Sequence, residues 1–168
     1  MIDLHAHILP QLDDGARTLD ESIEICRRSY QDGTRTIVAT PHILEGIYPN
    51  RRPTILAKVQ ELNAAIVKCG LWNAEYGMKT LDSQISCHSN SELPACQSTC
   101  TAGRRTHHSE LPLVILPGAD VHFSSDMPQL CENGDIVTVN DKGQYLMVEF
   151  DSQGIPYHAE DVLFRLMT

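Results

Sequence analysis

The sequence is poor in basic residues and contains no long apolar run. Its 168 residues include 13 Lys and Arg against 22 Asp and Glu, which gives a formal net charge of -9 at pH 7. A chain of this charge repels nucleic acid and anionic lipid surfaces, so we expect no nucleic-acid partner. Apolar runs of about 18 residues are absent, and Met1 opens no basic segment of the kind that precedes a signal sequence. We therefore expect a cytoplasmic protein without membrane insertion.

Two cysteine patterns that carry specific chemistry are also missing. The six cysteines form no paired CxxC knuckles, which would indicate a structural zinc site. None begins a CxxxxxR loop, so a phosphatase mechanism with a cysteine nucleophile is not expected. In a reducing compartment the thiols should be free, and we expect Cys26 and Cys131 in small, buried apolar positions.

Strand-like and helix-like segments alternate along most of the chain. Apolar and β-branched runs predict strands at residues 2–4, 35–40, 113–116 and 145–148. Apolar spacing predicts helices from Thr18 to Gly33, from Pro53 to Gly70 and over 158–166. This alternation is typical of an α/β fold in which helices connect parallel strands, as in a βα barrel. A closed barrel needs about seven or eight strands, so four predict only its first half.

Residues 71–110 have a different composition, rich in Ser, Thr, Cys, His and Gln and without periodicity. Three explanations stay open. The segment is a disordered insertion, a sequence never selected for this fold, or a small metal-binding excursion that uses Cys87, Cys96, Cys100, His107 and His108. We expect one incomplete domain over residues 1–168 with an atypical insertion at about 71–110.

Six His, Asp and Glu residues fall at or just beyond the ends of predicted strands. The pattern Asp3-Leu4-His5-Ala6-His7 directs two imidazoles toward one ion from the same side of a strand. Catalytic groups of βα barrels gather at the carboxyl ends of the strands. Taken singly, each residue also has an ordinary role as a cap or an ion-pair partner. As a set they predict metal ligation by His5, His7, Asp14, His42, Asp120 and Glu149.

The segments that carry these residues resemble the metal-dependent tyrosine-protein phosphatases of the PHP superfamily from bacterial capsule and exopolysaccharide systems. The similar segments are residues 1–10, 13–16, 36–42, 116–120 and 145–150, and the resemblance covers about 1–70 and 111–168. It implies a PHP-type βα barrel, a distorted TIM-like fold, whose C-terminal half is missing here. It also implies hydrolysis of phosphotyrosine in proteins, with a bacterial tyrosine kinase as partner, and homo-oligomers formed through the helix around residues 21–28.

The resemblance further implies up to three divalent ions, commonly manganese. One ion would use His5, His7 and Asp120, a second Asp120 and Glu149, and a third Asp14 and His42. The family completes each site with a His or Asp from its C-terminal half, which also supplies phosphate-binding arginines. Asp120 stands where the family has Glu, so its carboxylate reaches one methylene less far between two ions.

Two alternatives to a protein phosphatase stay open. Histidinol phosphatases share the HxH opening, so a small phosphate ester is a second substrate class. The chain could also be an inactive remnant or a binding module. The sequence leaves the substrate-binding residues unknown and predicts no catalytic residues other than the metal ligands.

Overall fold

A computed structural model of the protein describes residues 1–69 and 113–167. The elements of the first range are β1 (Ile2–Ala6), α1 (Leu19–Gln31), β2 (Thr36–Ala39), β3 (His42–Ile43) and α2 (Arg52–Lys68). Those of the second are β4 (Val114–Pro117), β5 (Asp120–His122), α3 (Met127–Glu132), the 3-10 turn η1 (Val139–Asp141), β6 (Met147–Glu149) and α4 (Ala159–Met167). The expected insertion at 71–110 lies outside the described residues. The predicted α/β class with parallel strands is confirmed.

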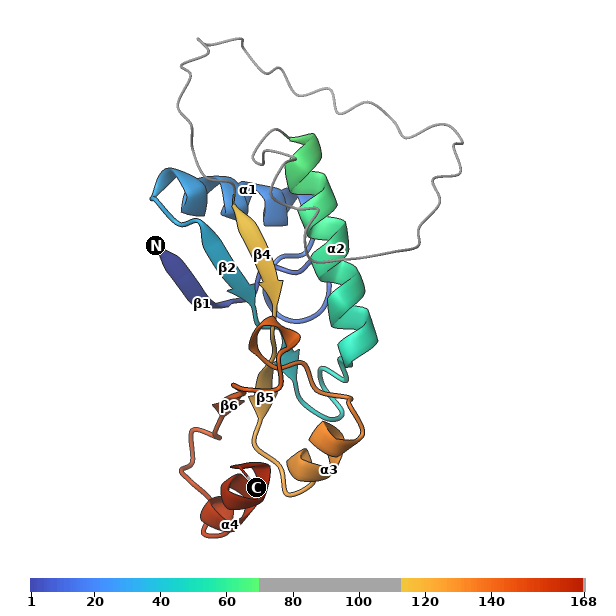
Figure 1. The fold of residues 1–168 in the computed structure, drawn as a ribbon, viewed down its shortest axis with the longest axis vertical. Coiled ribbons are helices and arrows are strands. Elements are labelled where there is room, and N and C mark those ends of the chain that lie inside the picture. Colours follow the sequence, from blue (N-terminus) through green and yellow to red (C-terminus); the bar gives the residue numbers. More distant parts are fainter. Residues whose placement is uncertain (70–112, 168) are drawn as a thin grey trace.

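The strands form two three-stranded parallel sheets, β1-β2-β4 and β3-β5-β6, and the second continues the first (Figure 1). Two residues separate β2 from β3, and two separate β4 from β5. Backbone hydrogen bonds cross both breaks, because Thr40 donates to the carbonyl of Ala6 at 2.9 Å and Asp120 donates to that of Pro41 at 3.1 Å. The junction between the sheets is therefore a bend in paired strands, with β1 and β6 at the two edges.

Gly118 makes the bend between β4 and β5 sterically feasible. A Cβ atom at this position would lie 2.7 Å from Cγ1 of Val38 and 3.3 Å from the carbonyl oxygen of Ala39. Carbon atoms do not approach that closely without displacement of a neighbour. A glycine at this position lets the β4–β5 connection pass directly over the end of β2.

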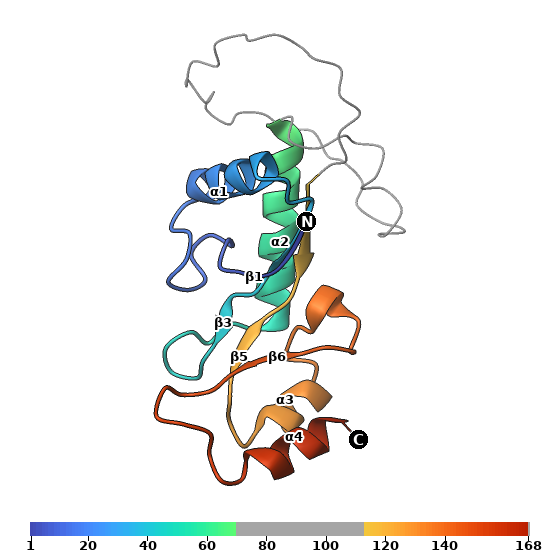
Figure 2. The ribbon, with the colours of Figure 1, turned by 90° about the vertical axis from the view of Figure 1, so that its left-hand side faces the viewer.

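Helices α1 and α2 cover the first sheet, and α2 runs along the strands behind β1 in Figure 2. Fully buried side chains fill the space between the sheet and the helices: Ile37 and Ile115 from the strands, and Ile55 and Leu62 from α2. Asn63 of α2 also satisfies the outer edge of β4, since its amide donates to the carbonyl of Ile115 at 2.9 Å and its oxygen accepts from the Ile115 N–H at 3.2 Å. Burial and edge capping together hold the first sheet rigidly against α2.

The predicted helix starts are close to those in the structure. Thr18 caps α1 by accepting from the N–H of Glu21 at 3.2 Å, while the Glu21 carboxylate accepts from Arg17 at 2.7 Å instead of from Thr18. Pro53 lies in the first turn of α2. Four short elements have no predicted range: β3, β5, α3 and η1. Strands of two or three residues are too short to show a period.

The described cysteines are free thiols. Cys26 is fully buried in α1, and burial raises the pKa of its thiol to about 12. Cys131 lies inside α3 and is only partly buried, with its pKa also raised by burial. In the described part of the chain, every helix is too short or too polar to cross a membrane.

Candidate metal centre

The first cluster of possible ligands forms where β1 ends. Nε2 of His5 and Nε2 of His7 are 3.0 Å apart, and Oδ2 of Asp120 is 3.8 Å from the His5 nitrogen. The Asp120 side chain is 6% exposed and enters from β5, at the opposite side of the sheet junction. Two imidazole nitrogens and one carboxylate oxygen therefore share a space the size of one coordination sphere.

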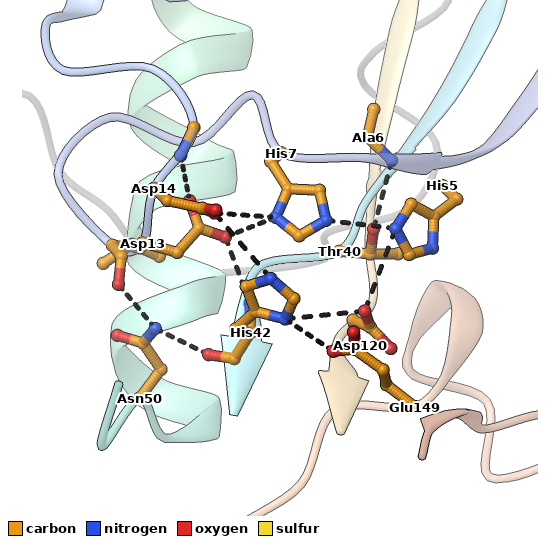
Figure 3. Close-up of polar contacts among 12 residues, drawn as sticks. His5, Ala6, His7, Asp13, Asp14, Thr40, His42, Asn50, Asp120 and Glu149 are labelled. Carbon is orange, nitrogen blue, oxygen red and sulfur yellow. Dashed lines mark hydrogen bonds and ion pairs between the residues drawn. The ribbon is translucent and has the colours of Figure 1, made fainter. Parts of the chain in front are cut away.

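His42 lies between two groups of carboxylates (Figure 3). Its Nδ1 is 3.5 Å from Oδ2 of Asp120 and 3.3 Å from Oε2 of Glu149. Its Nε2 points to the other side, 3.7 Å from Oδ1 of Asp14. The ring stacks on Tyr48 with a centroid separation of 5.7 Å, which fixes its plane. Because a neutral imidazole has one free lone pair, His42 can ligate an ion on only one of these two sides at a time.

The six predicted ligand residues meet at the junction of the two sheets. They form three groups whose ligand atoms lie within 4.8 Å of one another: His5, His7 and Asp120; His7, Asp14 and His42; and His42, Asp120 and Glu149. Register explains the meeting of β3, β5 and β6. His42 pairs with Asp120, and Asp120 pairs with Met147, two residues before Glu149. Residues two apart on a strand share a face, so Glu149 points to the same side as Asp120.

The turn that carries Asp14 folds back onto His7. The N–H of Ala16 donates to the carbonyl of His7 at 3.2 Å, and a Cβ at Gly15 would lie 2.1 Å from that same oxygen. Only glycine permits this approach. The preceding residues Ile8 and Leu9 are buried in the core and anchor the turn from below.

Asn50 ties this turn to β3. Its side-chain amide donates to the carbonyl of Leu12 and to that of His42, both at 2.8 Å. Asn50 is itself buried, so these two bonds satisfy both amide hydrogens. Asn50 is not among the residues predicted for the site, because no local pattern around it indicates one.

Asp13 is the second residue that the sequence analysis did not select. Its side chain is 1% exposed, and its Oδ2 lies 2.8 Å from Nδ1 of His7. The neighbouring Asp14, which the sequence analysis did select, is 67% exposed and reaches no histidine nitrogen closer than 3.7 Å. The pattern that could have identified Asp13 is the acidic pair Asp13-Asp14. Two adjacent carboxylates on a turn point in different directions and therefore have different partners.

The charge around the centre favours cations over anions. An open pocket at the junction is lined by His5, His7, His42, Asp120, Met147, Val148 and Glu149, none of which is Lys or Arg. Carboxylates without a basic partner repel anions, phosphate esters included. Imidazole nitrogen mixed with carboxylate oxygen is a donor set that suits divalent manganese, iron or zinc. The residues present therefore fit divalent metal ions, and a phosphate group would enter only alongside them.

The sequence is similar to a described family and to named tyrosine-protein phosphatases. Residues 1–76 match the family model described as capsular polysaccharide synthesis, CpsB/CapC. Tyrosine-protein phosphatase YwqE of Bacillus subtilis is 27% identical over 166 residues, which are 99% of this chain and 49% of the relative. Tyrosine-protein phosphatase CpsB of Streptococcus agalactiae is 29% identical over 153 residues, which are 91% of this chain and 46% of the relative.

The fold is also similar to that of a solved structure. That structure is one of the crystal structures of YwqE from Bacillus subtilis and CpsB from Streptococcus pneumoniae, which are described as metal-dependent tyrosine phosphatases. The match has a TM-score of 0.71 at 27% identity and covers 99% of this chain and 51% of that one. The chain thus spans about half the length of the relatives that it matches. The predicted resemblance is confirmed: the chain is similar to the CpsB/CapC tyrosine-protein phosphatases over about half of their length.

Proposed function

We propose that this protein acts as a metal-dependent phosphoesterase on phosphotyrosine in proteins, in the control of capsular or exopolysaccharide synthesis. The observation that carries the proposal is the meeting of three imidazoles and three carboxylates at one sheet junction. The names of the relatives supply the substrate class, since they are tyrosine-protein phosphatases. A bacterial tyrosine kinase is the phosphorylated partner that we propose.

The ligand assignment that we propose follows the three clusters. His5, His7 and Asp120 hold one ion, Asp120 and Glu149 a second, and Asp14 with His42 a third. Manganese is the metal that we propose for them. The chemistry that such ions supply is activation of water at neutral pH and neutralisation of the phosphoryl oxygens.

The residues of the chain itself orient this chemistry and bind the ester. Tyr48 holds the His42 ring in its plane, and the backbone bonds of the β1–α1 turn hold His7 and Asp14. Met147 and Val148 add an apolar wall to the pocket beside Glu149. A methionine side chain packs well against an aromatic ring, so this wall suits the phenyl group of phosphotyrosine better than a polar phosphate ester.

For the architecture, we propose that the paired strands are part of a PHP-type βα barrel and that residues 1–168 form a single, incomplete domain of that kind. Both edge strands support this proposal, because β1 and β6 each have one side without a strand partner among the described residues. The proposed homo-oligomer contact is helix α1, whose Glu24 bonds Arg27 and Arg28 within the helix.

The proposal is tested by phosphate release from a phosphotyrosine peptide with the whole chain and added manganese. We expect release that depends on metal and stops with a chelator. His5→Ala removes one nitrogen ligand and should lower the rate at least about 10-fold. His158→Ala is the matched control, because His158 contacts Ser125 and Phe123 away from the junction and should leave the rate unchanged.

Two results would contradict the proposal. Absence of metal-dependent release from the peptide would exclude the activity for this chain and favour a binding module. Faster release from histidinol phosphate than from the peptide would move the function to the small-molecule phosphatases.

A further inference from the structure

Asp13 is buried beside the metal centre without belonging to any of its three ligand groups. Its side chain is 1% exposed, in contrast to the exposed carboxylate of Asp14. A carboxylate in such a position must have hydrogen-bond donors around it, because an unpaired buried charge is strongly unfavourable. The donors that surround Asp13 define what it does.

Three donors from three separate segments bind Asp13. Its Oδ1 accepts from the N–H of Gly15 at 3.0 Å. Its Oδ2 accepts from the N–H of His42 at 3.1 Å and lies 2.8 Å from Nδ1 of His7. One side chain therefore joins the end of β1, the turn that carries Asp14 and the start of β3. Each of these segments holds at least one of the proposed metal ligands.

The contact with His7 determines where the imidazole proton lies. An ionised carboxylate only accepts, so a nitrogen at 2.8 Å from it must carry a hydrogen. With the proton on Nδ1, the lone pair of a neutral His7 is on Nε2. That nitrogen faces Nε2 of His5 at 3.0 Å, on the side of Asp120.

We propose that Asp13 is the positioning residue of the metal centre: it holds His7 as the Nδ1-protonated tautomer and locks its ring against the backbone of His42. The inference rests on the proposed metal centre. It also decides between two of the ligand groups, because His7 then serves the ion of His5 and Asp120 and is not free for the group with Asp14 and His42. A carboxylate that accepts from a ligating histidine typically strengthens metal binding about 10- to 100-fold.

Asp13→Asn is the variant that tests this role. The amide keeps the size of the carboxylate and one acceptor oxygen, which in the place of Oδ1 can still accept from the N–H of Gly15. It cannot accept from three donors, and its NH₂ group turned toward His7 demands an acceptor at Nδ1. His7 would then carry its proton on Nε2, where the ion should bind.

Two measurements read out the variant without relying on catalysis. Long-range proton–nitrogen NMR of the metal-free protein, at a pH where the histidines are neutral, reports the tautomer, with His7 assigned from a His7→Ala sample. Manganese binding followed by electron paramagnetic resonance gives the affinity. We expect an Nδ1-protonated His7 in the unaltered protein, an Nε2-protonated one in Asp13→Asn, and manganese affinity about 10- to 100-fold lower in the variant.

Asp14→Asn is the matched control, one residue further along the same turn. Its side chain is exposed and makes no contact with His7 shorter than 3.8 Å. It should weaken only the ion of Asp14 and His42 and leave the His7 tautomer unchanged. If Asp13→Asn fails to fold, the tautomer in the unaltered protein still decides the question.

The possible contradictions are distinct. An Nε2-protonated His7 in the unaltered, manganese-binding protein would overturn this inference alone, as would unchanged manganese affinity in folded Asp13→Asn. Absence of manganese binding by the unaltered protein would overturn the proposed function and this inference together.

Discussion

The two sheets of the molecule differ in what covers them and in what they carry. The first sheet, β1-β2-β4, has strands of four or five residues and lies under the 13 residues of α1 and the 17 residues of α2. The second, β3-β5-β6, has strands of two or three residues, with the short helix α3 after β5 and the short helix α4 after β6. Figure 1 shows the two regions stacked along the long axis.

Exposure of apolar side chains separates the packed face of the first sheet from the end of the chain, although Ile2 and Leu4 of the edge strand β1 are exposed too. In the first region Ile37, Ile55 and Leu62 are 0% exposed, whereas near the end of the chain Tyr157 is 99% and Phe164 63% exposed. The candidate metal centre lies between the two regions and takes its proposed ligands from both. The face of the first sheet that packs on α2 supplies the apolar packing, and the polar junction beyond it is free to carry charged groups that a core excludes.

The largest stability effect is expected in the first region. Leu62→Ala removes a fully buried side chain of α2 and should lower the free energy of unfolding by about 2–5 kcal/mol. Urea denaturation followed by circular dichroism measures it. Phe164→Ala is the control from the second region, where the exposed ring should contribute less than about 0.5 kcal/mol. Equal losses from both variants would remove the contrast between the regions.

The next effect is expected at the junction itself. Asp120→Asn removes the charge of the carboxylate that faces both the His5–His7 pair and the His42–Glu149 pair. We expect manganese affinity to fall by at least about 10-fold, measured by titration calorimetry. Asp126→Asn, in front of α3, is the control with the same change of charge and should bind as the unaltered chain does. Equal binding by both variants would exclude Asp120 from the centre.

A smaller effect is expected where the first region contacts the chain before β6. Arg52 at the start of α2 forms two bonds with Asp141, at 2.9 and 2.6 Å, and this pairing raises the pKa of Arg52. Both side chains are partly exposed, so Arg52→Ala should cost only about 0.2–1 kcal/mol, and less in high salt. Denaturation at two salt concentrations tests this, and a loss independent of salt would contradict an electrostatic origin.

The smallest effect is expected for alkylation of the Cys26 thiol. Burial raises the pKa of its thiol to about 12, so almost no thiolate exists at pH 8 and the native protein should show no alkylation at this residue. Cys69 is exposed and should react under the same conditions. Peptide mapping by mass spectrometry after iodoacetamide treatment separates the two. Modification of Cys26 at the rate of Cys69 would show that the first region opens readily.

Local signals in the sequence determined much of the first region. Thr18 and Pro53 marked the starts of α1 and α2, and β-branched runs marked β2 and β4, because caps and apolar periods act over a few residues. The six candidate ligands were also chosen from the sequence, since residues that follow parallel strands collect at one edge. For the strand at 145–148 the prediction was displaced, with β6 at Met147–Glu149.

Only the tertiary structure decided how those ligands meet. The pairing of His42 with Asp120 joins residues from opposite sides of the long segment between α2 and β4, and the bend at Gly118 depends on the position of Val38. The proposed role of Asp13 has the same origin, because its partners His7 and His42 come from the end of β1 and from β3. Composition and period act along the chain, whereas hydrogen-bond partners of a buried carboxylate are set by which strands fold side by side.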